Sequence, residues 1–236
     1  MELNARRQLN PKIITIDGPS GVGKGTIAIM VANYLGYNYL DSGSLYRALA
    51  LALSEKNIDL DRDIDDVEKI IRDVEIDFQY QKSGETSVFV NQIDFTEKIR
   101  TEKVAKMASQ IAKIPKARDM LEAVQRSHIK PPGLVADGRD MGTKVFKEAN
   151  IKFFLTASVE KRAERRLNQL KDQGISANLP ILKHELLLRD KADTERTISP
   201  LAPAADAIIV DTSELNATEV FYKIKEFIDK IFKIYE

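Results

Sequence analysis

Apolar positions in the first sixty residues alternate between the spacing of a strand and that of a helix. Residues 12–17 form a short β-branched run, which predicts a buried strand, and a glycine-rich turn follows it. Apolar residues then recur every four positions up to a glycine: Ile27, Val31, Leu35 and Gly36. A second strand over 37–40 and a second apolar stripe repeat the order, at Leu45, Leu49 and Leu53. This alternation is typical of a parallel sheet covered by helices.

The middle of the chain changes to a period of two. Apolar and polar residues alternate over 74–80 and again over 88–90. Turn residues separate these runs at Ser83-Gly84, and a further turn is expected at Asn91-Gln92. Alternation with tight turns predicts half-exposed antiparallel strands, so we expect a small β insert at about 61–100.

The rest of the chain returns to helices and short apolar strands. Helices are expected over 102–113 and 115–128, and further strands over 134–137, 151–156 and 207–210. Capping residues predict the starts of three more helices, at Ser158, at Asn178 and at the pair Asn216 and Glu219. The first two should run to Gly174 and to about Asp190. The fold class is therefore α/β, a five-stranded parallel sheet flanked by helices, with one antiparallel insert.

Composition narrows the function classes. The 236 residues hold 36 Lys and Arg against 36 Asp and Glu, no cysteine, no tryptophan and two histidines. Zero net charge and the lack of an arranged aromatic and basic pattern argue against nucleic-acid binding as the main function. The lack of cysteine excludes thiolate chemistry, and two histidines leave little room for chemistry built on several imidazoles. His128 and His184 are expected on helix surfaces without a role. We see no secretory or membrane-spanning segment, so we expect a cytoplasmic protein, and the sequence favours a monomer.

The strongest motif follows the first strand directly and opens the first helix. It is a P-loop, formed by Gly18, Pro19, Ser20, Gly21, Val22, Gly23, Lys24, Gly25 and Thr26. Its glycines let backbone N–H groups surround a phosphate, and Lys24 supplies a charge for the β- and γ-phosphates. The alternative is a glycine-rich turn with an accidental lysine. The flanking strand and helix favour a nucleoside triphosphate site.

One position departs from the commonest P-loop. Gly25 follows Lys24, where Ser or Thr usually stands, so Thr26 or Ser20 would have to help with magnesium. Asp137 ends a core strand near the loop and could hold magnesium through water, although it could also be a cap or turn residue. We therefore expect Mg²⁺ with the nucleotide, with Thr26 and Asp137 as candidate ligands.

Arginines distinguish a kinase from other P-loop proteins. Arg47 and Arg139 follow the carboxyl ends of two core strands, where open α/β sheets bind ligands. Arg162, Arg165 and Arg166 share one helix at spacings that let them point into the same space, and Arg189 and Arg196 follow. Each arginine alone could be a solvated surface charge. Together they suit phosphoryl transfer, whose transition state spreads negative charge.

The chain resembles bacterial cytidylate kinases over nearly its whole length, from about Ile13. The resemblance rests on the segments 16–26, 40–47 (LDSGSLYR), 94–101, 136–143 (ADGRDMGT) and 199–207. It implies a P-loop kinase fold that transfers the γ-phosphoryl group of ATP to CMP or dCMP with magnesium. It also implies three regions: a core at about 12–60, 130–157 and 204–236, an acceptor-binding region with the insert at 61–129, and a lid at 158–200.

The resemblance also implies roles for single residues. Ser42, Arg47, Arg139 and Arg196 should surround the acceptor phosphate, Arg189 and Asp193 should touch the sugar, and Ser109, Arg118 and Asp140 should read cytosine. Arg162, Arg165 and Arg166 should move with the lid around the ATP phosphates, and Lys24 and these arginines should be catalytic together with Arg139. Asp140 can accept from the cytosine amino group and Arg118 can donate to N3 and O2. Alternatively, Asp140 orients Arg139 and Ser109 is a surface hydroxyl.

Two further functions remain open from the sequence. One is a P-loop kinase with another acceptor, such as AMP, UMP or a small metabolite, and the cytosine-reading residues argue against it. The other is a nucleotide-binding regulator, which would not need the lid arginines and lacks the guanine motif of the GTPases. No general base is evident, and transfer to an anionic phosphate oxygen hardly needs one.

Overall fold

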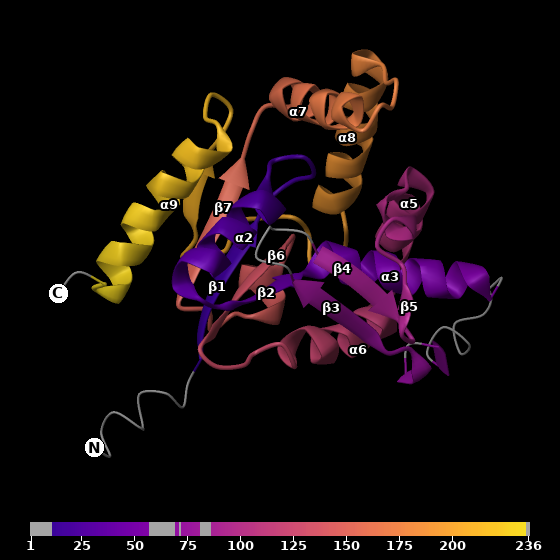
Figure 1. Ribbon diagram of the computed structural model, residues 1–236, viewed down its shortest axis with the longest axis horizontal. Helices are drawn as coiled ribbons and strands as arrows, with labels where there is room; N and C mark the ends of the chain where they lie inside the picture. Colours follow the sequence, from indigo (N-terminus) through magenta and orange to yellow (C-terminus); the bar gives the residue numbers. More distant parts are fainter. Residues whose placement is uncertain (1–10, 57–68, 71, 81–85, 235–236) are drawn as a thin grey trace.

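A five-stranded parallel sheet forms the centre of the molecule in the computed structural model, which describes residues 11–56, 69–70, 72–80 and 86–234 (Figure 1). Its strands are β1 (Lys12–Asp17), β2 (Asn38–Asp41), β6 (Gly133–Gly138), β7 (Ile151–Thr156) and β8 (Ile208–Asp211). They lie in the order β2-β6-β1-β7-β8, and every neighbouring pair is parallel. The predicted strands are confirmed, with ends that differ by at most one residue. Because β1 and β6 are buried along both faces, they carry almost continuous apolar runs.

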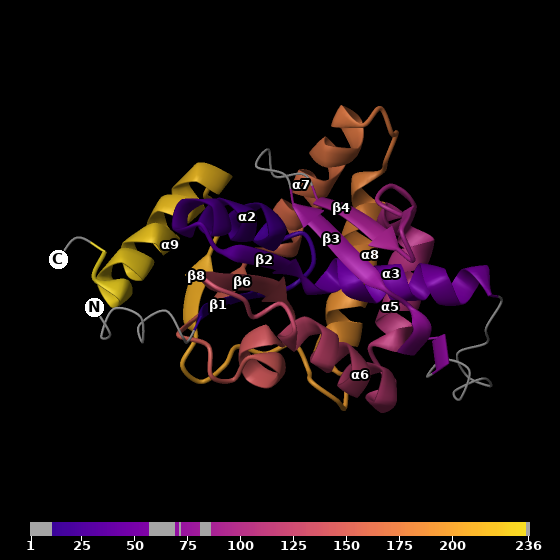
Figure 2. The same cartoon turned by 60° about the horizontal axis from the view of Figure 1, so that its bottom comes forward.

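Helices α2 (Lys24–Leu35) and α9 (Ala217–Phe232) pack on the sheet as neighbours (Figure 2). Their apolar stripes join the sheet in one hydrophobic cluster, which includes Ile27, Val31, Val220, Ile224 and Ile228. The cap predicted for α9 is confirmed as a capping box between Asn216 and Glu219. On the other face, the turn of π-helix Met141–Val145 closes a smaller apolar cluster.

The antiparallel insert is confirmed as a second, separate sheet. It consists of β3 (Ile76–Tyr80), β4 (Thr86–Val90) and β5 (Ile93–Asp94) in that order. Asn91 and Gln92 turn the chain between β4 and β5 with φ of 48° and 66°, which is a conformation that asparagine tolerates well. The predicted turn at residues 83–84 lies outside the described residues.

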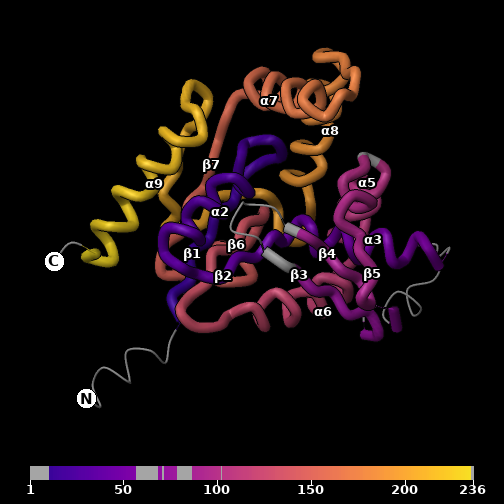
Figure 3. The backbone as a smooth tube through the Cα atoms, viewed as in Figure 1, coloured from indigo at the N-terminus to yellow at the C-terminus, as the bar shows by residue number. Residues whose placement is uncertain are grey.

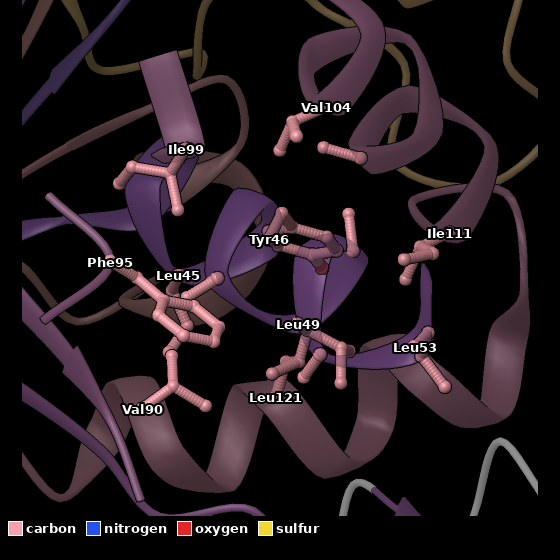
Figure 4. Close-up of a cluster of buried hydrophobic side chains, with 14 of the residues drawn as sticks. Leu45, Tyr46, Leu49, Leu53, Val90, Phe95, Ile99, Val104, Ile111 and Leu121 are labelled. Carbon is pink, nitrogen blue, oxygen red and sulfur yellow. The ribbon is translucent and has the colours of Figure 1, made fainter. Parts of the chain in front are cut away.

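Helix α3 (Ser42–Glu55) forms the centre of a large hydrophobic cluster beside the sheet (Figure 4). The insert, the 3₁₀ turn Lys98–Arg100, α5 (Glu102–Ile111) and α6 (Pro115–Arg126) all pack on it. Leu49 and Leu53 of α3 meet Ile111 and Leu121 there. The sequence assigned α3 to the core region, and its apolar face packs in this second cluster with the insert.

Helices α7 (Val159–Asp172) and α8 (Leu179–Thr194) project together above the P-loop (Figures 1 and 3). Ser158 and Asn178 cap them as predicted. They share a small cluster of their own, centred on Ala163, Leu182 and Leu186. This cluster makes the pair a unit with its own apolar centre.

The structure differs from two further sequence expectations. α8 continues to Thr194, one turn past the predicted end, and this extension brings Asp193 onto the helix. His128 was expected on a helix surface, but it is half-buried just beyond α6, where its ring lies against Phe78. His184 is exposed on α8 as expected. No helix in the part of the chain that the structure describes is long and apolar enough to cross a bilayer.

Candidate active site

The P-loop lies between the end of β1 and the start of α2, and it is held open by glycines. Gly18, Gly21 and Gly23 have φ of 150°, 75° and 95°, which L side chains rarely adopt. A Cβ at Gly18 would lie 2.3 Å from the carbonyl oxygen of Leu155, so this position admits only glycine. The loop therefore wraps close to the neighbouring strand β7 before α2 begins at Lys24.

Side chains take up the carbonyl oxygens of this loop. Lys24 Nζ donates to Pro19 O at 2.8 Å, and Arg162 donates to Ser20 O at 2.9 Å. Arg165 reaches Val22 O at 3.3 Å. With its carbonyls bound to cations, the loop is suited to offer N–H groups to an anion, together with the positive end of the α2 dipole.

Lys24 is buried, and its charge is destabilised in the free protein. Burial, together with the nearby cations of Arg139 and Arg189, lowers the pKa of Lys24 to about 7, and the carboxylates of Asp137 and Asp17 act in the opposite direction. A negative phosphate in the loop would reverse this effect because an opposite charge favours the ammonium form. The sheet places Arg139 beside the P-loop, because Gly138 pairs with Asp17, the residue directly before the loop.

Beside Lys24, Gly25 faces two oxygen-bearing side chains. A Cβ at Gly25 would lie 3.5 Å from the Tyr39 hydroxyl and 3.6 Å from a carboxylate oxygen of Asp137. Tyr39 donates to Asp137 at 3.3 Å, and both side chains are buried. Burial and the neighbouring Asp41 carboxylate raise the pKa of Asp137 well above its usual range.

This donor set fits magnesium held partly by nucleotide and water. Mg²⁺ in nucleotide sites commonly keeps several waters and takes one or two carboxylates with the phosphates, and Asp137 is a carboxylate at the required edge of the loop. Thr26 is exposed on the first turn of α2. Within the described residues, no group of three His, Cys, Asp or Glu side chains could hold a metal on its own.

A cleft beside the P-loop collects most of the predicted arginines; we call it the arginine cleft. Its lining residues are Ser42, Gly43, Tyr46, Arg47, Ala108, Ser109, Ala112, Arg118, Gly138, Arg139, Asp140, Arg189, Asp193 and Arg196. They come from α3, α5, α6, the end of β6, α8 and the loop after α8. All nine side chains that the sequence assigned to CMP are therefore brought together.

Arg118 and Asp140 form an ion pair inside the arginine cleft. Arg118 donates through NH2 to Asp140 Oδ2 and through NH1 to Ala112 O at 3.2 Å, and both side chains are 6% exposed. Arg118 Nε, also buried, has no hydrogen-bond partner in the described part of the chain. Tyr46 lies beside the guanidinium, with 5.9 Å between its ring centre and Arg118 Cζ. This cluster offers a ligand both an acceptor and donors.

Asp193 holds the arginines on the other side of the cleft. Arg139 Nε donates to Asp193 Oδ2 at 2.9 Å, and Arg196 NH1 lies 4.0 Å from the other carboxylate oxygen. These cations lower the pKa of Asp193 although its burial acts in the opposite direction. The alternative that Asp140 orients Arg139 is therefore wrong: Asp140 pairs with Arg118, and Asp193 orients Arg139.

The remaining cleft residues project from helix ends and faces. Ser42 opens α3, next to its cap Asp41, and accepts a hydrogen bond from Gln125 at 2.8 Å. Arg47, one turn further, donates to Ile99 O at 3.1 Å. Ser109 donates to Ala105 O, four residues back on α5, at 3.2 Å. Ser109 is thus not simply an exposed hydroxyl, because it lines the cleft.

The three arginines of α7 do not point into one space. Arg162 is buried, where it pairs with Asp190 of α8 and holds Ser20. Arg165 turns toward Thr212 and Leu215 as well as Val22. Arg166 lies along the helix and donates to Gln169 at 2.9 Å. Their spacing places Arg162 and Arg165 toward the P-loop, and Arg166 is rotated away from them.

Asp17 is a site residue that the sequence reasoning missed. It ends β1 and accepts hydrogen bonds from the backbone N–H groups of Met141 at 2.9 Å and Gly142 at 2.8 Å. Burial raises the pKa of Asp17 to about 6. Asp17 thereby fixes the turn after Arg139 and Asp140 against the P-loop. The only signal in the sequence was its position directly before Gly18.

Comparison with known proteins agrees with this geometry. The family described as "Cytidylate kinase" matches residues 14–230. A cytidylate kinase of Colwellia psychrerythraea is 44% identical over 93% of this chain and 97% of its own length. Those of Acinetobacter baylyi (45%, covering 94% and 98%) and Acinetobacter baumannii (46%, covering 92% and 96%) are similar to the same extent.

Proposed function

The chain belongs to the cytidylate kinase family, and from this premise we propose that it transfers the γ-phosphoryl group of ATP to CMP or dCMP. In the reaction, an oxygen of the acceptor phosphate attacks the γ-phosphorus, the bond to the β-phosphate oxygen breaks, and ADP leaves. CDP or dCDP is the second product. The acceptor oxygen is already anionic near neutral pH, so positioning and charge carry the catalysis.

The buried pair of Arg118 and Asp140 is the observation that carries the choice of base. Cytosine offers an amino group at N4 and acceptors at N3 and O2, so it needs an acceptor and donors side by side. Asp140 accepts from N4 and Arg118 donates to N3 and O2, with Ser109 at the edge of the same cleft. Uracil would bring a carbonyl against the Asp140 carboxylate, and an unpaired buried polar group can discriminate by up to about 10⁴-fold.

The other cleft residues are assigned to the phosphate and the sugar. Arg47, Arg139 and Arg196, with Ser42, surround the acceptor phosphate, and the pairing of Arg139 and Arg196 with Asp193 keeps both guanidinium groups in place. Arg189 and Asp193 contact the sugar. Arg139 lines the arginine cleft and also acts electrostatically on Lys24, so we assign its charge to stabilising the transferred phosphoryl group.

On the ATP side, the P-loop and Lys24 bind the phosphates and stabilise the charge that develops during transfer. Asp137 is our candidate for holding magnesium through water, with Thr26 as the second candidate. Magnesium, when bound, neutralises charge on the β- and γ-phosphates. We assign residues 158–200 to a lid in which Arg162, Arg165 and Arg166 approach the phosphates after exchanging their present partners. Closure of such a lid excludes water as a competing acceptor.

The test is ADP production with ATP and magnesium, comparing CMP, dCMP, UMP, AMP and GMP side by side. Strong turnover with CMP and dCMP alone supports both the reaction and the cytosine-reading pair. Comparable turnover with UMP would keep the kinase and reject the account of base discrimination. No turnover with any of them would reject the kinase. We also propose that the protein is a cytoplasmic monomer. Its molar mass in solution, measured by light scattering after size-exclusion chromatography, tests whether it is a monomer.

A further inference from the structure

Gln125 is a buried polar side chain outside the arginine cleft that contacts one of its residues. It lies on α6 and is 1% exposed. Its amide nitrogen is 2.8 Å from Ser42 Oγ, and Ser42 is itself 4% exposed. The two residues are 83 positions apart in the sequence. Burying an amide destabilises a protein unless its hydrogen bonds are satisfied. The partner of a buried glutamine therefore indicates which residue it serves to position.

The direction of this bond determines what Ser42 can do. A hydroxyl has one proton and two lone pairs, whereas the amide NH₂ group only donates. Because Gln125 donates, Ser42 Oγ uses a lone pair in that bond and keeps its own proton for another partner. Ser42 lines the arginine cleft, so the partner available to that proton is an acceptor atom of a ligand there.

Helix α6 connects Gln125 with the base-reading end of the cleft. Arg118 stands seven residues before Gln125, two turns earlier on the same side of α6. Leu121, between them, packs in the cluster around α3, the helix that Ser42 opens. Helix α6 therefore positions Arg118 directly and the hydroxyl of Ser42 through Gln125.

We propose that Gln125 is a positioning residue for the acceptor nucleotide, which holds Ser42 as a hydrogen-bond donor toward the acceptor phosphate. This inference rests on the proposed function because it takes Ser42 to contact the acceptor. It predicts an effect on CMP and none on ATP, and the effect must pass through the Ser42 hydroxyl.

The experiment is a double-mutant cycle in the equilibrium dissociation constant of CMP. Gln125→Met keeps the volume and removes the amide, and Ser42→Ala removes the hydroxyl. We expect each single variant to weaken CMP binding by about 10- to 150-fold, which is the usual size of a hydrogen bond to a charged group. The double variant should bind CMP within about twofold of Ser42→Ala, because Gln125 has nothing left to orient. The dissociation constant of ATP should not change.

A second variant and a control keep the result decisive if Gln125→Met folds poorly. Gln125→Leu is close in size and also lacks a donor, so it should weaken CMP binding as much as Gln125→Met does. Ser127 is exposed and follows directly after the last residue of α6, so Ser127→Ala should bind CMP like the parent. Normal CMP binding by Gln125→Leu would overturn the inference.

The remaining outcomes separate this inference from the proposed function. Additive losses in the cycle, or equal losses for ATP and CMP, would make Gln125 a structural residue and overturn the inference alone. Normal CMP binding by Ser42→Ala would do the same. A parent protein that does not bind CMP would overturn the inference together with the proposed function.

Discussion

The P-loop and the arginine cleft bind anions in different ways. The P-loop consists of nine consecutive residues, and its conformation depends on glycine φ angles and backbone groups. The arginine cleft is made of side chains from six parts of the chain, and carboxylates hold its cations: Asp193 orients Arg139, and Asp140 pairs with Arg118. A local backbone site recognises the phosphates common to all nucleotides, whereas side chains gathered by the fold can recognise one base.

Lys24→Ala gives the largest expected effect on the P-loop side. Turnover should fall about 10²-fold or more because a charge that stabilises the transition state is lost. CMP binding should be nearly unchanged, since the arginine cleft stays intact. Steady-state kinetics together with CMP titration measure both. Near-normal turnover would contradict the assignment of the P-loop.

Arg118→Met tests the other region. It leaves the Asp140 carboxylate buried without its cation. Removing one partner of a buried charge pair in a binding site lowers the binding free energy by about 2–5 kcal/mol. We expect kcat/KM for CMP to fall about 10²-fold while the dissociation constant of ATP stays the same. Lys116→Met, at an exposed position on the same helix, is the matched control. An equal loss for both nucleotides would show that Arg118 supports the fold instead of reading the base.

Arg47→Ala should affect both kinetic constants of the acceptor. We expect about a 10-fold rise in KM for CMP and about a 10-fold fall in kcat, because a cation at the acceptor phosphate serves binding and positioning alike. Arg47 also donates to Ile99 O at 3.1 Å, so the melting temperature must be recorded with the kinetics. If neither constant changes, Arg47 does not contact the acceptor.

The smallest effect concerns a proton. Burial lowers the pKa of Lys24 to about 7, so at pH 8 most of the free protein carries neutral Lys24. Bound ADP phosphates favour the ammonium form and raise this pKa, so binding should take up close to one proton at pH 8. Calorimetry in two buffers of different ionisation enthalpy measures the uptake, and Lys24→Met should abolish it. Binding without proton uptake would mean that Lys24 is already charged in the free protein.

The two regions also differ in how far the sequence could predict them. The succession of strands and helices along the chain, the insert and the P-loop can be predicted from periodicity and from glycines within a few residues of one another. The resemblance to the family predicted which nine residues bind CMP, and the structure brings all nine together in the arginine cleft. Their pairing could not be predicted: Asp140 is next to Arg139 in sequence, yet it pairs with Arg118, 22 residues away.

The residues that sequence reasoning missed act through tertiary contacts. Asp17 binds the backbone 124 residues further on, and Gln125 reaches back to Ser42. Tyr39 lies near Gly25, where a commoner P-loop would carry a hydroxyl, but in sequence it is only an aromatic residue in a strand. No local pattern distinguishes such residues from ordinary core positions, because their role depends on the element that packs against them.

The separate apolar centre of α7 and α8 has a mechanical consequence. Ala163, Leu182 and Leu186 hold the two helices together. Toward the P-loop, Arg162 donates to Ser20 O and Arg165 donates to Val22 O. The helices also lie against Gly21, which has no side chain. Opening an apolar seam of about 400 Å² would cost about 10 kcal/mol. A hydrogen bond from a charged group contributes about 1.5–3 kcal/mol, and water can take its place. Polar bonds also tie the pair to the rest of the core, from Arg139 to Asp193 and from Arg165 to Thr212. We therefore expect α7 and α8 to move as one unit, because any such motion exchanges polar bonds and leaves their apolar centre intact.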